Sequence, residues 1–195
     1  MPAFMGSRED ILSALRKAAP AQAPLPELPR GAAVQDLHEL FAARVVEAGG
    51  RCLRVPKFSE ELLGDLRRGR VVSLDAPPQG DPHALHDVEC CIVHGDFGVA
   101  ENGAVWITQH GGEQRAALFL TQHLVIVVSE LVPTLHEAYE RVKLSKGFGL
   151  FISGPSKTAD IEQALVIGAH GARSCTVYLV APVVIPEMKE LSESA

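Results

Sequence analysis

The sequence is poor in several features that mark whole classes of protein. Aromatic residues make up only 5 % of the chain, although 47 % of its residues are hydrophobic. A core rich in Ala, Val and Leu is typical of strands covered by helices on both faces. Lys and Arg form no dense cluster beyond Arg67-Arg68-Gly69-Arg70, and the formal net charge is −6. Nucleic acid is therefore not an expected partner.

Long apolar runs are also missing. The longest, 124–128 and 175–184, are too short or too interrupted to span a bilayer. The first residues, MPAFMGSRED, lack the basic start and apolar stretch of a secretory signal. We therefore predict a cytoplasmic protein without a membrane segment.

Cysteine occurs at four positions, none of them in a CxxC pair: Cys52, Cys90, Cys91 and Cys175. Adjacent cysteines do not readily ligate one metal or cluster. We expect reduced, buried thiols and no iron–sulfur cluster in this chain. A redox role for Cys90-Cys91 is the alternative. The sequence identifies no cofactor. No metal site is predicted, because the histidines in loop-like regions also lack metal-site spacing. No role is assigned to His83, His86, His94 and His110.

Helix-like and strand-like segments alternate from residue 34, as in an α/β domain with parallel strands and right-handed crossovers. Helices are expected over 34–48, from Ser59 to about Arg68, and from Thr134 to about Lys146. Strands are expected over 51–55, 70–74, 88–93, 124–128 and 174–180. The 195 residues suffice for one such domain.

The domain organisation has three parts. Residues 1–33 combine a helix, capped near Ser7, with a proline-rich linker. Residues 34–185 form the main domain, and 186–195 form a charged tail. The first helix has no obvious partner within the chain and could dock on another subunit, so a homo-oligomer is possible.

The most informative stretch runs from Phe148 to Gly171. An apolar strand leads into Gly154-Pro155-Ser156-Lys157-Thr158, and a helix is expected to follow, with Asp160 and Glu162 in its first turn. Polar groups would then collect at the carboxyl end of a strand, where open α/β sheets usually bind ligands. The spacing excludes a Walker phosphate loop. Carboxylate chemistry, metal binding, phosphate binding and a purely structural cap all remain open.

Two further polar positions are candidates. Asn102-Gly103 between apolar runs predicts a hairpin turn, which would hold Glu101 rigidly as a nucleophile or general base. An exposed turn residue is the alternative. His170 lies between glycines, where a backbone can approach a ligand closely, although a solvated histidine fits as well.

These motifs resemble a known family. Ser153 to Glu162, followed by Gly168-Ala169-His170-Gly171, closely resembles the signature of the lactate-utilisation (LUD) domain, formerly a domain of unknown function, in the branch of lactate-utilisation protein C. The segment 98–103 is similar to the family's second motif. The resemblance covers about residues 35–182. It implies a three-layer α/β/α sandwich around a mostly parallel sheet, like that of ribose-5-phosphate isomerase, glucosamine-6-phosphate deaminase and coenzyme A transferases.

The resemblance also implies a function. It suggests a subunit of a system that oxidises L-lactate to pyruvate with separate iron–sulfur partner proteins. The ligand would be a small carboxylate or phosphorylated molecule that pairs with Lys157. Predicted chemical residues are Glu101, by analogy with coenzyme A transferases, and Asp160. Predicted binding residues are Gly154, Ser156, Lys157, Thr158, His170 and Gly171. Two rivals stay open: a stand-alone enzyme on a phosphorylated sugar, nucleotide or coenzyme A thioester, and a non-catalytic assembly module.

Overall fold

The computed structural model describes residues 7–20, 23–24, 36–76, 81, 84–109, 114–142, 147–159 and 165–180. Its contacts divide the chain into two units, residues 1–33 and 34–195. The first unit contains the expected helix, α1 (Ser7–Ala18), with acidic residues in its first turn, basic residues in its last and no buried side chain. Most of the expected linker and the tail 186–195 lie outside the described residues.

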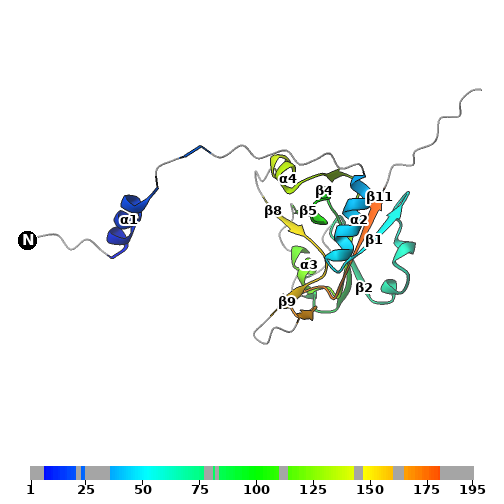
Figure 1. Ribbon diagram of the computed structural model, residues 1–195. Coiled ribbons are helices and arrows are strands. Elements are labelled where there is room, and N and C mark those ends of the chain that lie inside the picture. Colours follow the sequence, from blue (N-terminus) through cyan, green and yellow to red (C-terminus); the bar gives the residue numbers. More distant parts are fainter. Residues whose placement is uncertain are drawn as a thin grey trace, which may run out of the picture. The chain divides into compact units, whose positions relative to one another are not determined.

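The second unit is built on a five-stranded, fully parallel sheet (Figure 1). Its strands, in spatial order, are β1 (Arg51–Val55), β11 (Ser174–Val180), β6 (His123–Val128), β3 (Val88–His94) and β2 (Arg70–Ser73). Every neighbouring pair is parallel. The predicted α/β class with a mostly parallel central sheet is confirmed.

A second sheet contains four shorter strands, in the order β7 (Leu131–Val132), β4 (Phe97–Val99), β5 (Ala104–Gln109) and β8 (Phe148–Ile152). β4 and β5 form an antiparallel hairpin, and Gly103 in its turn has φ 68°. The turn predicted at Asn102-Gly103 is therefore confirmed. β8 pairs with β5, also antiparallel, so the strand before the Gly154 motif does not belong to the parallel sheet.

The longest helix among the described residues of this unit is α2 (Leu37–Glu47), which ends near the expected residue 48 but begins after Asp36 instead of at residue 34. The carboxylate of Asp36 accepts bonds from the N–H groups of His38 and Glu39 at 2.9 and 3.0 Å. At the other end, Gly49 has φ 82°, and the N–H groups of residues 49 and 50 donate to the carbonyls of residues 46 and 45. This pair of bonds is the Schellman motif that a glycine stop favours.

Three expected helices differ from the prediction. The segment Glu60–Arg68 is a 3-10 helix, η1, because Gly64 (φ 54°, ψ −124°) interrupts it, and the Ser59 side chain makes no capping bond. Helix α4 is shorter than expected, Leu135–Arg141. The helix predicted after Thr158 is wrong: β9 (Lys157–Ala159) pairs antiparallel with β10 (Leu165–Ile167). The β-branched Val166 and Ile167 favour this strand pairing.

Alternate residues of the central strands enter two separate cores. On one face, Ile126 packs with Phe41 and Val45 of α2, with the second sheet and with the short helix α3 (Ala117–Leu120). On the other face, Val127 packs with Leu63 of η1. Burial on both faces explains why these strands are almost continuously apolar. Within the part of the chain that the structure describes, no helix has the length and apolar character needed to cross a bilayer.

The cysteines yield a testable prediction. Burial raises the pKa of Cys90 to about 11 and that of Cys91 and Cys175 to about 12. Because only a thiolate reacts quickly, a thiol reagent at pH 8 should modify the half-buried Cys52 first and all four cysteines only after unfolding. Since these pKa values are raised, the stability due to the neutral thiols is present below the unfolded-state pKa. It is lost as the pH rises through 11 to 12.

The measurement is reaction with Ellman's reagent, with and without guanidinium chloride. Cys52→Ser is the control and should remove the fast phase. Rapid reaction of three or four thiols in the native protein would contradict the prediction.

Candidate functional site

The two sequence motifs meet on the C-terminal half of α2. The hydroxyl of Ser153 donates to the carbonyl of Asn102 at 3.1 Å. A Cβ atom at Gly103 would lie 2.6 Å from the backbone nitrogen of Val45, and one at Gly154 would lie 2.3 Å from the carbonyl oxygen of Ala48. Glycine at both positions therefore lets the two loops approach the helix backbone closely.

Ser156 contacts the second half of the motif directly. Its N–H donates to the carbonyl of Ala172 at 2.9 Å, and its carbonyl accepts from the N–H of Gly168 at 3.0 Å. A Cβ atom at Gly171 would lie 3.1 Å from Cβ of Ser156. The structure thus brings together two predicted binding residues, Ser156 and Gly171.

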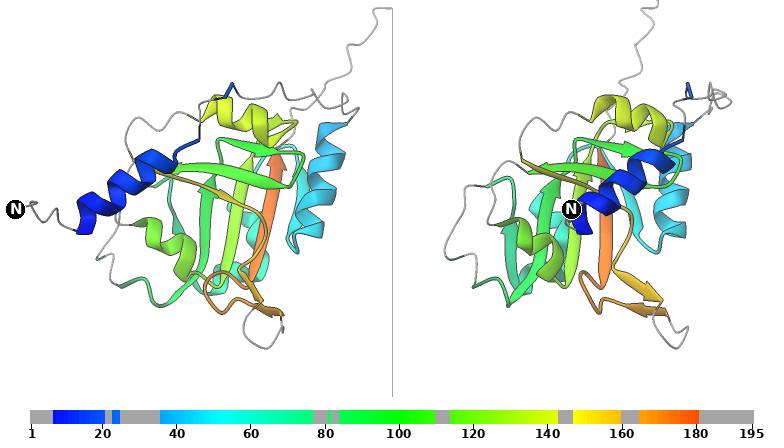
Figure 2. Two further views of the ribbon diagram at one scale, coloured as in Figure 1. Left: turned by 60° about the vertical axis from the view of Figure 1, so that its left-hand side comes forward. Right: turned by 90° about the vertical axis from the view of Figure 1, so that its left-hand side faces the viewer.

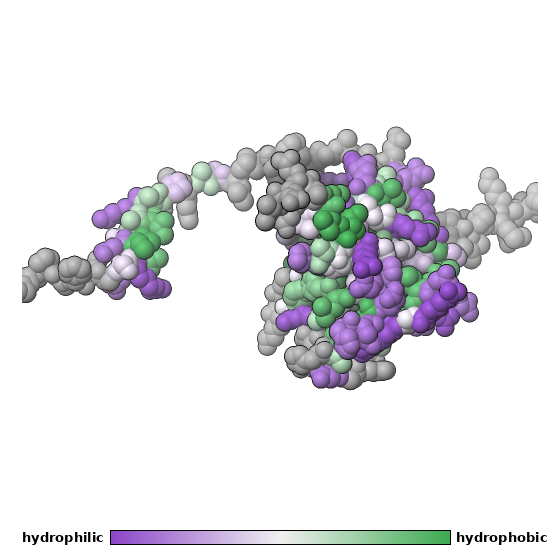
Figure 3. Space-filling model, turned by 90° about the horizontal axis from the view of Figure 1, so that it is seen from below, coloured by the Kyte–Doolittle hydropathy of each residue, from purple (hydrophilic) through white to green (hydrophobic). Residues whose placement is uncertain are grey.

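The motif lies at the amino end of the parallel sheet. The prediction that it lies at the ligand-binding carboxyl edge of an open α/β sheet is therefore wrong. Residues 168–173 lead into the start of β11, and β9 and β10 lie at the same end of the unit (Figures 1 and 2). The reason is that β8 ends in the second sheet, so its carboxyl end does not coincide with that of the parallel strands. Figure 3 looks onto this end from below and shows polar residues between apolar patches.

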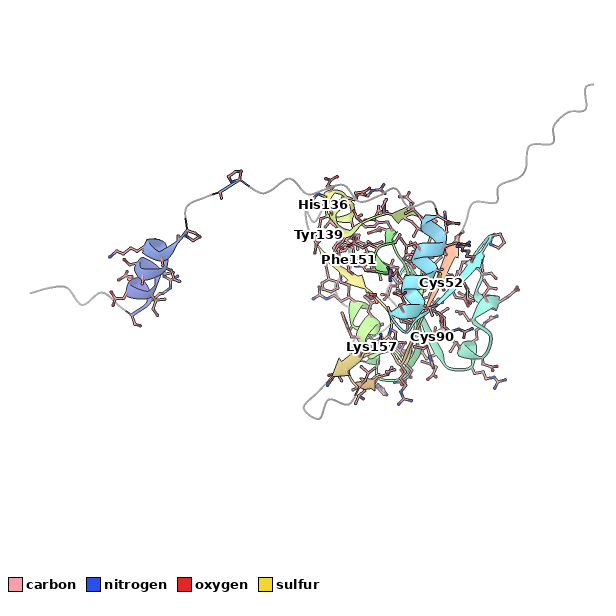
Figure 4. The ribbon with its side chains drawn as sticks, viewed as in Figure 1. Cys52, Cys90, His136, Tyr139, Phe151 and Lys157 are labelled. Atoms are coloured by element: carbon pink, nitrogen blue, oxygen red, sulfur yellow. The ribbon has the colours of Figure 1, made fainter. Side chains whose placement is uncertain are left out.

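The remaining predicted binding residues are exposed or half-buried. The ammonium group of Lys157 lies against the C-terminus of α2, 3.2 Å from the position of a Cβ atom at Gly49, where the helix dipole favours a cation. Thr158 pairs with Val166 in the hairpin, and His170 is exposed. Asp160 lies outside the described residues. Figure 4 labels Lys157, the first residue of β9.

Glu101 is bonded to helix α4. Its carboxylate accepts from the N–H of Leu135 at 2.7 Å, and the hydroxyl of Thr134 caps the same helix by accepting from the N–H of Glu137 at 3.2 Å. Helix α4 and strand β9 lie at opposite ends of the unit in Figures 1 and 2. Glu101 therefore does not face Lys157, and a chemical role for Glu101 stays a prediction.

Glu101→Ala should lower the free energy of unfolding by about 1 kcal/mol, because Leu135 loses its capping acceptor. Urea denaturation measures this difference. Glu140→Ala is the matched control on the same helix, since the Glu140 carboxylate only approaches His136 at 4.0 Å. Equal stability of the two variants would contradict the capping role.

A cavity of about 430 Å³ opens at the same amino end of the sheet. It is lined by His86, Asp87, Val88, Glu89, Gln122, His123 and Arg173. The sequence predicts none of these residues as part of the site and gives His86 no role. The local feature that they share is their position: each lining residue comes just before an expected strand or among its first residues.

Several of the charged groups around this cavity are already partnered. Arg70 bonds Asp87 at 2.5 Å and holds the pKa of that carboxyl below its usual range. Nδ1 of His123 is 2.8 Å from the hydroxyl of Ser174, and its Nε2 is 3.4 Å from a carboxylate oxygen of Glu89. Arg173 is exposed and forms no ion pair with any residue that the structure describes.

The fold and the motif contacts define an α/β domain whose ligand-sized cavity lies at the amino end of a parallel sheet. The family model of the LUD domain matches residues 81–180, more than half of the chain. The chain belongs to the LUD domain family, as its motifs predicted.

Relatives and a solved structure agree with this assignment. The chain is 38 % identical over 89 residues to lactate utilization protein C of Bacillus pumilus, a match covering 41 % of this chain and 37 % of that protein. It is 34 % identical over 142 residues to lactate utilization protein C of Geobacillus kaustophilus, covering 64 % and 59 %. These matches thus span less than two thirds of each relative. A crystal structure of a DUF162 family protein from Deinococcus radiodurans shares the fold, with a TM-score of 0.54 at 18 % identity, covering 73 % of this chain and 95 % of that one.

Proposed function

We propose that the chain is a cytoplasmic subunit of a system that oxidises L-lactate to pyruvate together with separate iron–sulfur proteins. The relatives named lactate utilization protein C support a role for the chain in a lactate-utilisation system. The observation that carries a carboxylate ligand is that two cationic side chains, Lys157 within the family motif and Arg173 two residues after it, form no ion pair with a described residue. Cationic N–H donors bind carboxylates strongly. The four cysteines without a CxxC pair support clusters on partner proteins.

The proposed binding residues are those of the motif: Gly154, Ser156, Lys157, Thr158, His170 and Gly171. Glu101 and Asp160 are the proposed carboxylates for the chemistry. The glycines allow the loops to approach neighbouring backbone closely. The backbone of Ser156 bonds the first part of the motif to the second, and Lys157 supplies positive charge.

The test is growth of a host that depends on this gene for lactate utilisation. Deletion should abolish growth on lactate and leave growth on glucose unchanged. Lys157→Gln and Asp160→Asn should slow growth on lactate, whereas Lys57→Gln, on an exposed loop, should not. A deletion strain that grows normally on lactate would refute the proposed function.

A second candidate is an enzyme acting on a phosphorylated sugar, a nucleotide or a coenzyme A thioester. The cavity volume of about 430 Å³ supports it, because it lies in the range of about 300–1,000 Å³ that is typical of pockets for larger ligands. A ligand present at 100 times its dissociation constant stabilises a protein by about 2.7 kcal/mol. Thermal shifts with such compounds, and none with lactate or pyruvate, would favour this candidate.

A further inference from the structure

Three polar side chains form a continuous row across the amino ends of three neighbouring strands. Glu89 is on β3, His123 starts β6 and Ser174 starts β11. The sheet register pairs His123 with both Ser174 and Cys90, which places the histidine in the middle of the row. The sequence separations are large, so only the parallel sheet brings the three together.

A β-bulge turns Glu89 toward the histidine. The pairing of β2 with β3 steps from Val88 directly to Cys90, which leaves Glu89 as the extra residue. Val88 and Cys90 then enter different cores. The Glu89 stem is held by Gly69, where a Cβ atom would lie only 2.4 Å from Cβ of Glu89. Bulges of this kind often redirect a side chain next to a functional site.

The contacts of His123 determine how it can bond a ligand. A hydroxyl can donate to an imidazole nitrogen, whereas a carboxylate can only accept, so the neutral ring carries its proton on Nε2. Nδ1 then accepts from the hydroxyl of Ser174 at 2.8 Å. The 3.4 Å between Nε2 and the Glu89 oxygen exceeds normal hydrogen-bond lengths. A ligand hydroxyl in the cavity could contact both groups from one side, accepting from Nε2 of His123 and donating to Glu89.

Arg173 supplies the charge for the other end of such a ligand. Its side-chain stem lies against Gly168 of the family motif, where a Cβ atom would be 2.4 Å from Cγ of Arg173. Its backbone N–H donates to the carbonyl of Gln122 at 2.8 Å, which joins the starts of β6 and β11. Asp87 is already paired with Arg70 and does not compete for Arg173.

The lining also limits the charge of the ligand. Glu89 would repel a second carboxylate, since like charges in a partly desolvated cavity disfavour each other. One cation and one hydroxyl-binding pair fit a molecule with one carboxylate and one neighbouring hydroxyl group.

We propose that this cavity binds a small 2-hydroxy monocarboxylic acid. Arg173 pairs with the carboxylate, and His123 and Glu89 bond the hydroxyl, with Ser174 holding the imidazole in place. The proposal rests on the proposed function for its leading ligand, L-lactate. A 2-oxo acid binds more weakly, because a carbonyl oxygen cannot donate to Glu89.

Isothermal titration of the full-length protein with L-lactate, pyruvate, propanoate and malate tests the ligand class. L-lactate should bind about tenfold or more tightly than propanoate, which lacks the hydroxyl, because one hydrogen bond to a charged group is lost. Pyruvate and malate should also bind more weakly than L-lactate. No binding of L-lactate, or tighter binding of malate or propanoate, would overturn the proposal.

Variants test the assignment of residues. Arg173→Gln, His123→Gln and Glu89→Gln should each weaken L-lactate binding by about tenfold or more. Arg141→Gln and His136→Gln on α4 are matched controls and should leave binding unchanged. If a variant fails to fold, imidazole NMR signals of the wild-type protein decide the point. L-lactate should shift the His123 signals and leave those of His136 unmoved, and the reverse would refute the site.

Failure of this site and failure of the proposed function give different results. If deletion abolishes growth on lactate while Arg173→Gln grows and binds normally, the site is refuted and the function stands. If Arg173→Gln loses binding while the deletion strain still grows on lactate, the function is refuted and the site stands.

Discussion

Phe41→Ala should lower the free energy of unfolding by about 3–5 kcal/mol, the range typical of a large aromatic side chain removed from a core. Phe41 has 0 % of its surface exposed and belongs to the core that joins α2 to both sheets. Its ring fills the space next to Gly98 of β4, where a Cβ atom would lie 2.7 Å from a ring carbon. Shrinkage of this side chain therefore leaves a cavity between the two sheets.

Urea denaturation, followed by the fluorescence of the buried Trp106, measures the loss. Phe119→Ala is the matched control, because Phe119 is 48 % exposed on α3 and should lose about 1 kcal/mol or less. Gly98→Ala should destabilise the wild-type protein and do less harm in the Phe41→Ala background, where the ring is absent. Similar losses for both phenylalanines would contradict this description of the core.

Gly154→Ala should be the second most damaging change, with a loss of about 2–5 kcal/mol. Gly154 has φ 75°, a conformation that costs an L-residue about 1–2 kcal/mol. The added methyl group would also meet the carbonyl oxygen of Ala48 at 2.3 Å, so the loop or α2 must move, and such overpacking costs about 1–3 kcal/mol more.

Gly64→Ala separates these two contributions. Gly64 also has a positive φ, 54°, but no atom lies within 4 Å of its Cβ position, so its loss comes from the backbone conformation alone. Equal losses for the two variants would show that the contact with Ala48 contributes nothing. Denaturant midpoints and slopes for the two variants provide the comparison.

Much of the fold is predictable because local signals and tertiary structure agree. The runs Leu124–Val128 and Ser174–Val180 are mostly apolar because both faces of their sheet are buried, and they are strands as expected. Asn102-Gly103 forms its turn, and Thr134 caps its helix. Each of these features depends on residues close together in the sequence.

The helix expected after Thr158 shows where local signals mislead. Ser or Thr followed by acidic residues is typical of a helix start, yet Lys157 and Thr158 pair with Ile167 and Val166 instead. The backbone of Ser156, directly before β9, also bonds Gly168 and Ala172, which lead into β11. Pairing partners six or more residues away decide the outcome, and no capping pattern includes them.

The candidate site is even less local. Ser174 and His123 are 51 residues apart, and Glu89 is brought beside His123 by a bulge that no composition or periodicity indicates. Glu101 stands in a predicted turn, but its partner Leu135 is 34 residues further on. The sequence shows which side chains could carry chemistry, and the sheet register decides which of them meet.

The position of β1 at an edge of the parallel sheet has a consequence for folding during synthesis. Among the strands that the structure describes, β1 neighbours β11 alone in that sheet, and Arg51 pairs with Thr176, 125 residues later. β1 must therefore wait, unpaired, until β11 has left the ribosome. Such non-local pairing slows folding and exposes strand edges to other chains, so the nascent protein is most prone to aggregation before residue 174 emerges.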